Sequence, residues 1–371
     1  MKKLLGTTAL VAAAFATAPA SAADKIQMKV GGYFVGSIAA VIDNDAVAGP
    51  GVDDRTFRFG KDAEIHFIGS TTLDNGVEIG VRAELELTED VTSANQNDDV
   101  VDEAYIWVGG AFGEFQFGAQ DGIGDQMAFA PPSPFLETFV NDTDLDPVGT
   151  QNGTNSATLG AGVDATVNAT LDESKDATKI IYFTPRIAGF QLGVSFAPEN
   201  EEITGDKSFT DTVSSNDDME NIFEIGANFE HSFNGVDVGL GGTYVTAENN
   251  TVGLSDFDAY SFGGSVGFVG VTVGGVYTMR DNVTAGVDET SDWALGATYG
   301  TGPWTFGVEY GERNRSAKGV PANKIDNNGI AAGVGYSLGG GANVTLGWLK
   351  RENDVTNQDA SAIFTEFGVK F

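Results

Sequence analysis

The chain has 371 residues, no cysteine and a formal net charge of −33. Acid in this excess argues against nucleic acid as a partner, and a hydrophobic content of 41% with 10% aromatic residues argues against disorder. The 50 glycines follow no collagen-like period and exceed the usual share of about 7%, so they must serve strands and tight turns.

The first 22 residues are expected to be a secretory signal peptide. Lys2 and Lys3 give it a charged start, residues 4–15 are largely apolar, and residues 20–22 (Ala-Ser-Ala) offer a cleavage site, with residues 18–20 as a second candidate. The apolar run is too short for a membrane-spanning helix of about 20 residues, and no later run is longer. Residues 23–371 are then expected to form a single domain.

Most of the remaining chain alternates apolar and polar residues, which indicates β-strands with two different faces. In residues 77–87 every odd position is apolar and every even position is Glu, Gly or Arg. Most of these segments have the length of about 9–11 residues that a tilted membrane-spanning strand needs. About sixteen strands are expected, at residues 28–42, 55–69, 77–89, 101–109, 114–120, 178–185, 189–197, 221–232, 236–246, 257–268, 270–280, 291–300, 303–311, 328–338, 342–351 and 361–371.

The connections between these strands alternate in length. Short ones carry Asn-Gly or Gly-Gly pairs, as at residues 73–76, 234–235 and 339–341, and such pairs favour tight hairpin turns. Long polar ones fall at residues 43–54, 90–100, 121–177, 198–220, 247–256, 281–290, 312–327 and 352–360. Short turns on one side and long loops on the other are typical of a transmembrane antiparallel β-barrel, so the predicted fold class is all-β.

The last strand supports this interpretation. Residues 361–371 have one apolar face, which ends at Phe371. A soluble protein rarely finishes on a bare apolar strand, because free chain ends usually fray. A closed barrel that faces lipid can use such a strand, and we expect it to pair with the first strand.

The connection at residues 121–177 is far longer than the usual loop of about 4–6 residues. A sixteen-stranded barrel has a lumen too wide for side chains to fill. We therefore expect this third loop to fold into the pore and to place carboxylates at the narrowest point. The residues expected there are Asp121, Asp125, Glu137, Asp142 and Asp144. The alternative is an external loop with no role in the pore.

Alternation also assigns side chains to the lumen. Phe57 and Phe59 are expected to face lipid, so the even-numbered residues of that strand face inward. The lumen residues expected on the second and third strands are Arg58, Glu64, Arg82, Glu84 and Glu86. Because rings of acidic side chains favour cations, weak cation selectivity is expected.

Metal and enzymatic sites find little support in the sequence. Asp142, Asp144 and Asp146 alternate like the start of a calcium loop, but the glycine expected at the sixth position is missing, so they are weak candidates. Loose binding of Ca²⁺ or Mg²⁺ to the acidic loops is the favoured alternative, and no cofactor is expected. His66 and His231 are the only histidines, which with the lack of cysteine argues against zinc sites. Carboxylates in a wet pore are too well solvated for acid–base catalysis, so no enzymatic activity is expected.

Two stretches carry a likeness to a known family. They are Glu103-Ala104-Tyr105-Ile106-Trp107-Val108-Gly109 followed by Phe112-Gly113-Glu114-Phe115-Gln116-Phe117-Gly118, and Lys179-Ile180-Ile181-Tyr182-Phe183-Thr184-Pro185 followed by Gly189-Phe190. With the signal peptide, the hairpin rhythm, the long third loop and the final Phe371, they make the chain resemble the general diffusion porins of Gram-negative bacteria. The likeness is greatest to porins of alphaproteobacteria.

This resemblance implies a homotrimer of sixteen-stranded barrels in the outer membrane, surrounded by lipid and lipopolysaccharide. Each pore would be narrowed by its third loop and would pass small hydrophilic solutes and ions by passive diffusion. The assembly machinery of the outer membrane would recognise Phe371. In such pores basic wall residues face acidic loop residues, whereas Arg58 and Arg82 here are mixed with many acids. The alternatives are a substrate-selective channel with a solute-binding constriction, a barrel enzyme or adhesin, and a soluble secreted β-protein.

Overall fold

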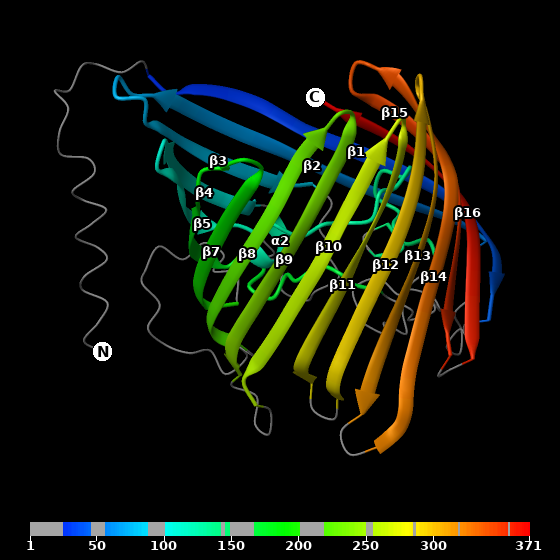
Figure 1. Cartoon of the computed structure of the whole chain (residues 1–371). Coiled ribbons are helices and arrows are strands. Elements are labelled where there is room, and N and C mark those ends of the chain that lie inside the picture. Colours follow the sequence, from blue (N-terminus) through cyan, green and yellow to red (C-terminus); the bar gives the residue numbers. More distant parts are fainter. Residues whose placement is uncertain are drawn as a thin grey trace.

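The computed structural model describes residues 25–45, 56–87, 101–141, 145–148, 167–200, 219–249, 255–284, 287–317, 320–354 and 357–371. These residues form sixteen antiparallel strands closed into one barrel (Figure 1). The predicted fold class is therefore confirmed. The predicted signal peptide lies outside the described residues. Within the described part of the chain, no helix is long and apolar enough to cross a membrane.

Each strand pairs with its neighbours in the sequence, and the first pairs with the last to close the ring. The strands of the first half are β1 (Gln27–Asn44), β2 (Phe57–Thr72), β3 (Glu78–Glu86), β4 (Val101–Gly110), β5 (Gly113–Ala119), β6 (Thr178–Phe183), β7 (Phe190–Glu199) and β8 (Met219–Phe233). Those of the second half are β9 (Val236–Asn249), β10 (Phe257–Phe268), β11 (Val271–Thr284), β12 (Val287–Thr301), β13 (Trp304–Ala317), β14 (Val320–Gly339), β15 (Ala342–Asn353) and β16 (Gln358–Lys370). Several strands extend beyond the predicted ranges toward the long loops, because pairing continues past the alternating segment.

The outer face of the barrel is apolar, as alternation predicts. Phe57 and Phe59 on β2 are 63% and 77% exposed. Aromatic pairs lie at two levels of the strands: the rings of Trp304 and Tyr336 are 4.5 Å apart at the short-turn end, and those of Trp293 and Tyr310 are 5.3 Å apart near the middle of β12 and β13. The amphipathic rings at the short-turn end suit an interface of a membrane with water.

The seam between β1 and β16 continues to the final residue. The Phe371 N–H donates to the Gly32 carbonyl at 3.0 Å, and the Gly32 N–H donates to the Phe371 carbonyl at 3.1 Å. The Phe371 side chain remains 64% exposed. The final aromatic is thus held by its backbone at the edge of the apolar band.

The described parts of the connection from β5 to β6, residues 120–141, 145–148 and 167–177, are called L3 below and run inside the barrel (Figure 1). It begins with a short helix, α2 (Ile123–Gln126), that contacts β7, β8 and β9. The predicted inward folding of the long third loop is therefore confirmed. L3 decides which part of the inner wall remains open to water.

Candidate functional site

L3 lies along a band of glycines on the inner faces of consecutive strands. A Cβ added at Gly263 would lie 2.9 Å from Phe129, one at Gly307 would lie 2.6 Å from Pro134, and one at Gly368 would lie 2.7 Å from Leu136. One such glycine on each strand from β7 to β16 forms this glycine track: Gly193, Gly226, Gly241, Gly263, Gly274, Gly296, Gly307, Gly333, Gly347 and Gly368. Glycine, which normally weakens strands, here leaves room for residues 123–136 against the wall.

The start of L3 is fixed by a buried carboxylate of β8. Glu224 accepts a hydrogen bond from the Gly124 N–H at 2.8 Å and another from the Ser195 hydroxyl at 2.9 Å. The Ser195 hydroxyl in turn accepts the Ile123 N–H at 3.2 Å. Two of the free N–H groups in the first turn of α2 are thereby bonded to side chains of the barrel wall.

Glu366 on β16 holds the middle of L3. Its carboxylate accepts the backbone N–H groups of Leu136, Glu137 and Thr138 at 2.9, 3.0 and 2.7 Å, and the Thr345 hydroxyl at 2.7 Å. The Glu366 side chain is fully buried. A buried carboxylate is tolerable only when donors replace its water, and four donors do so here.

Arg351 on β15 holds the next part of L3. Its guanidinium is fully buried, forms an ion pair with Asp146 at 2.8 Å, and donates to the carbonyls of Val140 and Phe139 at 2.5 and 2.9 Å. Asp146, a weak calcium candidate by sequence, is thus bound by an arginine. Asp142 and Asp144 lie outside the described residues, so the predicted calcium loop stays a prediction.

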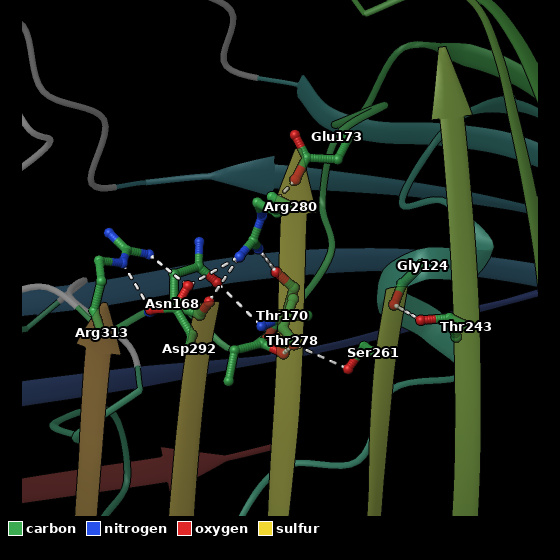
Figure 2. Close-up of polar contacts among 11 residues, drawn as sticks. Gly124, Asn168, Thr170, Glu173, Thr243, Ser261, Thr278, Arg280, Asp292 and Arg313 are labelled. Carbon is green, nitrogen blue, oxygen red and sulfur yellow. Dashed lines mark hydrogen bonds and ion pairs between the residues drawn. The ribbon is translucent and has the colours of Figure 1, made fainter. Parts of the chain in front are cut away.

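The returning part of L3 is held by a network centred on Asp292 of β12 (Figure 2). Asp292 accepts Arg313 Nε at 2.6 Å, Arg280 Nη1 at 3.1 Å and the Asn168 N–H at 3.2 Å. Arg280 also forms an ion pair with Glu173 of L3 at 2.7 Å. Asp292 is fully buried and its two arginines are nearly so. These basic groups hold the loop and present little charge to water.

Sequence reasoning did not single out Arg280, Arg313 or Arg351. Alternation along the strand could have shown that such an arginine faces the lumen. Tyr277 on β11 faces outward and is 40% exposed, so Arg280, three positions later, faces inward. What the sequence does not show is the pairing of Arg280 and Arg351 with L3 residues more than a hundred positions away, or that of Arg313 with Asp292.

The strands that the glycine track does not cross carry acidic side chains. On β2 to β4 these residues, named here the acidic wall, are Asp62, Glu64, Glu84, Glu86 and Glu103. The Tyr33 hydroxyl oxygen lies 2.9 Å from a carboxylate oxygen of Asp62 and 2.9 Å from one of Glu64, which places both residues on one face. Arg82 forms an ion pair with Glu84 and lies 4.0 Å from Glu103. The wall is therefore negative with one embedded arginine.

The other predicted pore residues lie at several places along L3 and its contacts. Arg58 on β2 donates to the Pro147 carbonyl at 2.7 Å and so links the wall to L3. The Asp121 N–H at the start of L3 donates to Glu103 at 3.3 Å. Asp125 lies in α2, and Glu137 is half-buried beside its bond to Glu366. The part that these residues play in conduction stays a prediction.

Asp121 is a half-buried carboxyl among other carboxylates. Burial raises its pKa above the ordinary value of 3.8; Lys179 opposes this shift, and the nearby charges of Glu84 and Glu224 add to it. Because the folded-state pKa is raised, the contribution of Asp121 to stability is full below the ordinary pKa and is lost as pH rises through the raised one.

Replacing Asp121 with asparagine should therefore remove part of the loss of stability on raising the pH above about 4. The measurement is the denaturant midpoint of the folded protein in detergent across this pH range. Asp74→Asn, in an exposed turn, is the matched control and should keep the wild-type profile. Identical profiles for Asp121→Asn and wild type would show that the pKa of this carboxyl is not raised on folding.

Solved barrels resemble this structure over nearly its whole length. OmpT of Vibrio cholerae, in a trimer form, has a TM-score of 0.62 and 14% identity, with 94% of this chain and all of that chain covered. An anion-selective porin from Comamonas acidovorans has a TM-score of 0.59 and 15% identity, with 94% and all covered. A porin variant of Rh. blastica has a TM-score of 0.57 and 17% identity, with 93% and all covered. At these identities the likeness shows the fold.

No curated protein matches the chain by sequence. The family description "Gram-negative porin" matches residues 6–356. This match spans nearly the whole chain and agrees with the closed barrel and the inward L3. The chain therefore belongs to the Gram-negative porin family and is an outer-membrane channel protein.

Proposed function

We propose that this porin is a passive diffusion channel for small hydrophilic solutes and ions, with a weak preference for cations. The observation that carries the proposal is the uneven distribution of charge around the pore. Arg280 and Arg351 are buried against L3, whereas the acidic wall lies on β2 to β4, which the glycine track does not cross. A permeating ion therefore meets more carboxylates than guanidinium groups.

The proposal includes no enzymatic reaction, because the carboxylates line a water-filled channel. It includes a homotrimer, supported by the trimer form of the OmpT barrel, with outer-membrane lipid and lipopolysaccharide around it. It also includes recognition of Phe371 by the barrel assembly machinery, for which the exposed final side chain is available. Ca²⁺ or Mg²⁺ held loosely by acidic loops would lower the repulsion among surface carboxylates.

The acidic wall should set the ion preference. The double variant Asp62→Asn with Glu86→Gln should lower the cation-to-anion permeability ratio about twofold or more, because a unit charge about 8 Å from an ion in water contributes about 0.5 kcal/mol. The measurement is the reversal potential of single channels in a planar bilayer under a KCl gradient.

Asp74→Asn, in an exposed short turn, is the control and should leave the reversal potential unchanged. Anion preference in the wild-type channel would overturn the proposed selectivity. Conductance that saturates with salt and is blocked by one class of solute would instead favour a substrate-selective channel. A linear current without such block supports passive diffusion.

A further inference from the structure

Three side chains of different chemistry converge on the open wall of the pore. His66 Nε2 on β2 lies 2.7 Å from Glu64 Oε2 on the same strand and 3.1 Å from Glu84 Oε2 on β3. Cross-strand pairing places His66 directly beside Glu84, and the period of two places Glu64 and His66 on one face. One nitrogen and two carboxylate oxygens therefore face a common point.

The second oxygen of each carboxylate is held by a neighbour outside this group. The Tyr33 hydroxyl donates to Glu64 Oε1 at 2.9 Å, and the Arg82 guanidinium contacts Glu84 Oε1. The Tyr33 ring also lies edge-on to the His66 ring, with centroids 6.2 Å apart. Outer groups that orient ligating carboxylates are a regular feature of protein metal sites. This outer support distinguishes the cluster from acidic residues that merely lie close together.

We propose that Glu64, His66 and Glu84 bind a divalent transition-metal cation of the zinc type on the pore wall. Zinc ligands at about 2.0–2.2 Å in tetrahedral geometry are about 3.3 Å apart, so the separations of 2.7 and 3.1 Å need to widen by about 0.6 and 0.2 Å. The His66 and Glu64 side chains are 18% and 15% exposed, so water in the lumen can reach a fourth position. An imidazole nitrogen favours zinc-like cations over calcium.

The scarcity of histidine and cysteine in the sequence argued against a zinc site. That expectation counted only nitrogen and sulfur ligands, and here two carboxylates complete the set around a single histidine. The competing interpretation of the same geometry is that His66 hydrogen-bonds to Glu64 and Glu84 without a metal. The two interpretations differ in whether the folded protein binds one zinc ion per chain.

A cation held here would offset negative charge on the acidic wall. Zinc at the wall should reversibly lower both the current and the cation preference of the channel. This consequence rests on the proposed cation-preferring pore, whereas the binding itself does not. The two can therefore fail separately: zinc that binds without altering the reversal potential would overturn the selectivity proposal and leave the site intact.

The test is zinc titration by calorimetry of the full-length protein, folded in detergent and stripped of metal with a chelator. Excess Ca²⁺ is included to occupy sites made of carboxylates alone. Wild type should bind one Zn²⁺ per chain, and His66→Gln should weaken this binding at least 100-fold. The matched control is His231→Gln, because His231 is the other histidine, lies near the short-turn end of β8 and packs on Phe233; it should bind like wild type.

Electron paramagnetic resonance with Cu²⁺ in place of Zn²⁺ should show one coordinated imidazole nitrogen in wild type and in His231→Gln, and none in His66→Gln. Tyr33→Phe keeps all three ligands and removes only the hydroxyl that holds Glu64, so it should weaken zinc binding about 10–100-fold. If His66→Gln does not fold, Tyr33→Phe is the variant that tests the site. No saturable zinc binding by wild type, or equal binding by wild type and whichever of these two variants folds, would overturn the site.

Discussion

Replacing Glu366 with alanine should release the middle of L3 from the barrel wall and produce a larger, noisier single-channel current. The change leaves the half-buried N–H groups of Leu136 and Glu137, the buried N–H of Thr138 and the buried Thr345 hydroxyl without their acceptor. Each unsatisfied buried donor costs about 1–3 kcal/mol. Relief from burying the carboxylate itself offsets part of this cost, so we expect a loss of about 3–5 kcal/mol, as for a broken buried charge network.

Single-channel recording and denaturant unfolding in detergent measure the two effects. The matched control is Glu352→Ala on the neighbouring β15. Its ion pair with Lys350 is partly exposed, so its loss should cost at most about 1 kcal/mol and leave the current unchanged. If Glu366→Ala behaves like Glu352→Ala, the Glu366 carboxylate does not hold L3.

Replacing Gly296 with valine should displace L3 where it crosses β12. A Cβ at this position would overlap the Pro132 carbonyl oxygen and lie 3.0 Å from the Pro131 Cβ. Two consecutive prolines have fixed φ angles and adjust poorly. The loop must therefore move off the wall, at a cost of about 1–3 kcal/mol for overpacking, and the conductance should change.

Gly300→Val on the same strand and face is the control for this variant. A Cβ at Gly300 meets only the Gly270 carbonyl at 3.9 Å, so the side chain has room. We expect Gly300→Val to keep the wild-type conductance and unfolding midpoint. Equal conductance for Gly296→Val and Gly300→Val would contradict the path of L3 along the glycine track.

The strands could be predicted from the sequence because alternation is a local signal. In residues 77–87 the alternation alone identifies the two faces of the strand, and no other segment is needed to assign them. The inward folding of L3 could also be predicted, because the connection is long and the number of strands sets a lumen too wide for side chains to fill. The path of L3 along the wall could not be predicted. The glycine track is assembled from ten strands, and the pairing register sets the level of each glycine along the barrel axis.

The charges of the pore show a second limit of sequence reasoning. Counting inward charges treats every arginine as a group that meets water, but Arg351 is fully buried against Asp146. Arg280 and Arg313 likewise form ion pairs with the buried Asp292. These pairs join residues of L3 or β12 to other strands, and only the fold brings them together. Because each of these arginines is paired with a buried or half-buried carboxylate, the charges that meet water in the pore cannot be counted from the sequence alone.

The most direct measurement is thiol labelling of a single cysteine on L3. The chain has no native cysteine, and Ala130 is an exposed residue in the part of L3 that crosses the glycine track. Ala130→Cys, labelled with a bulky thiol reagent during single-channel recording, should show a stepwise fall in conductance. The same reagent on Asp74→Cys, in an exposed short turn, should cause none. Complete labelling of Ala130→Cys with no change in conductance would contradict an L3 that narrows the pore.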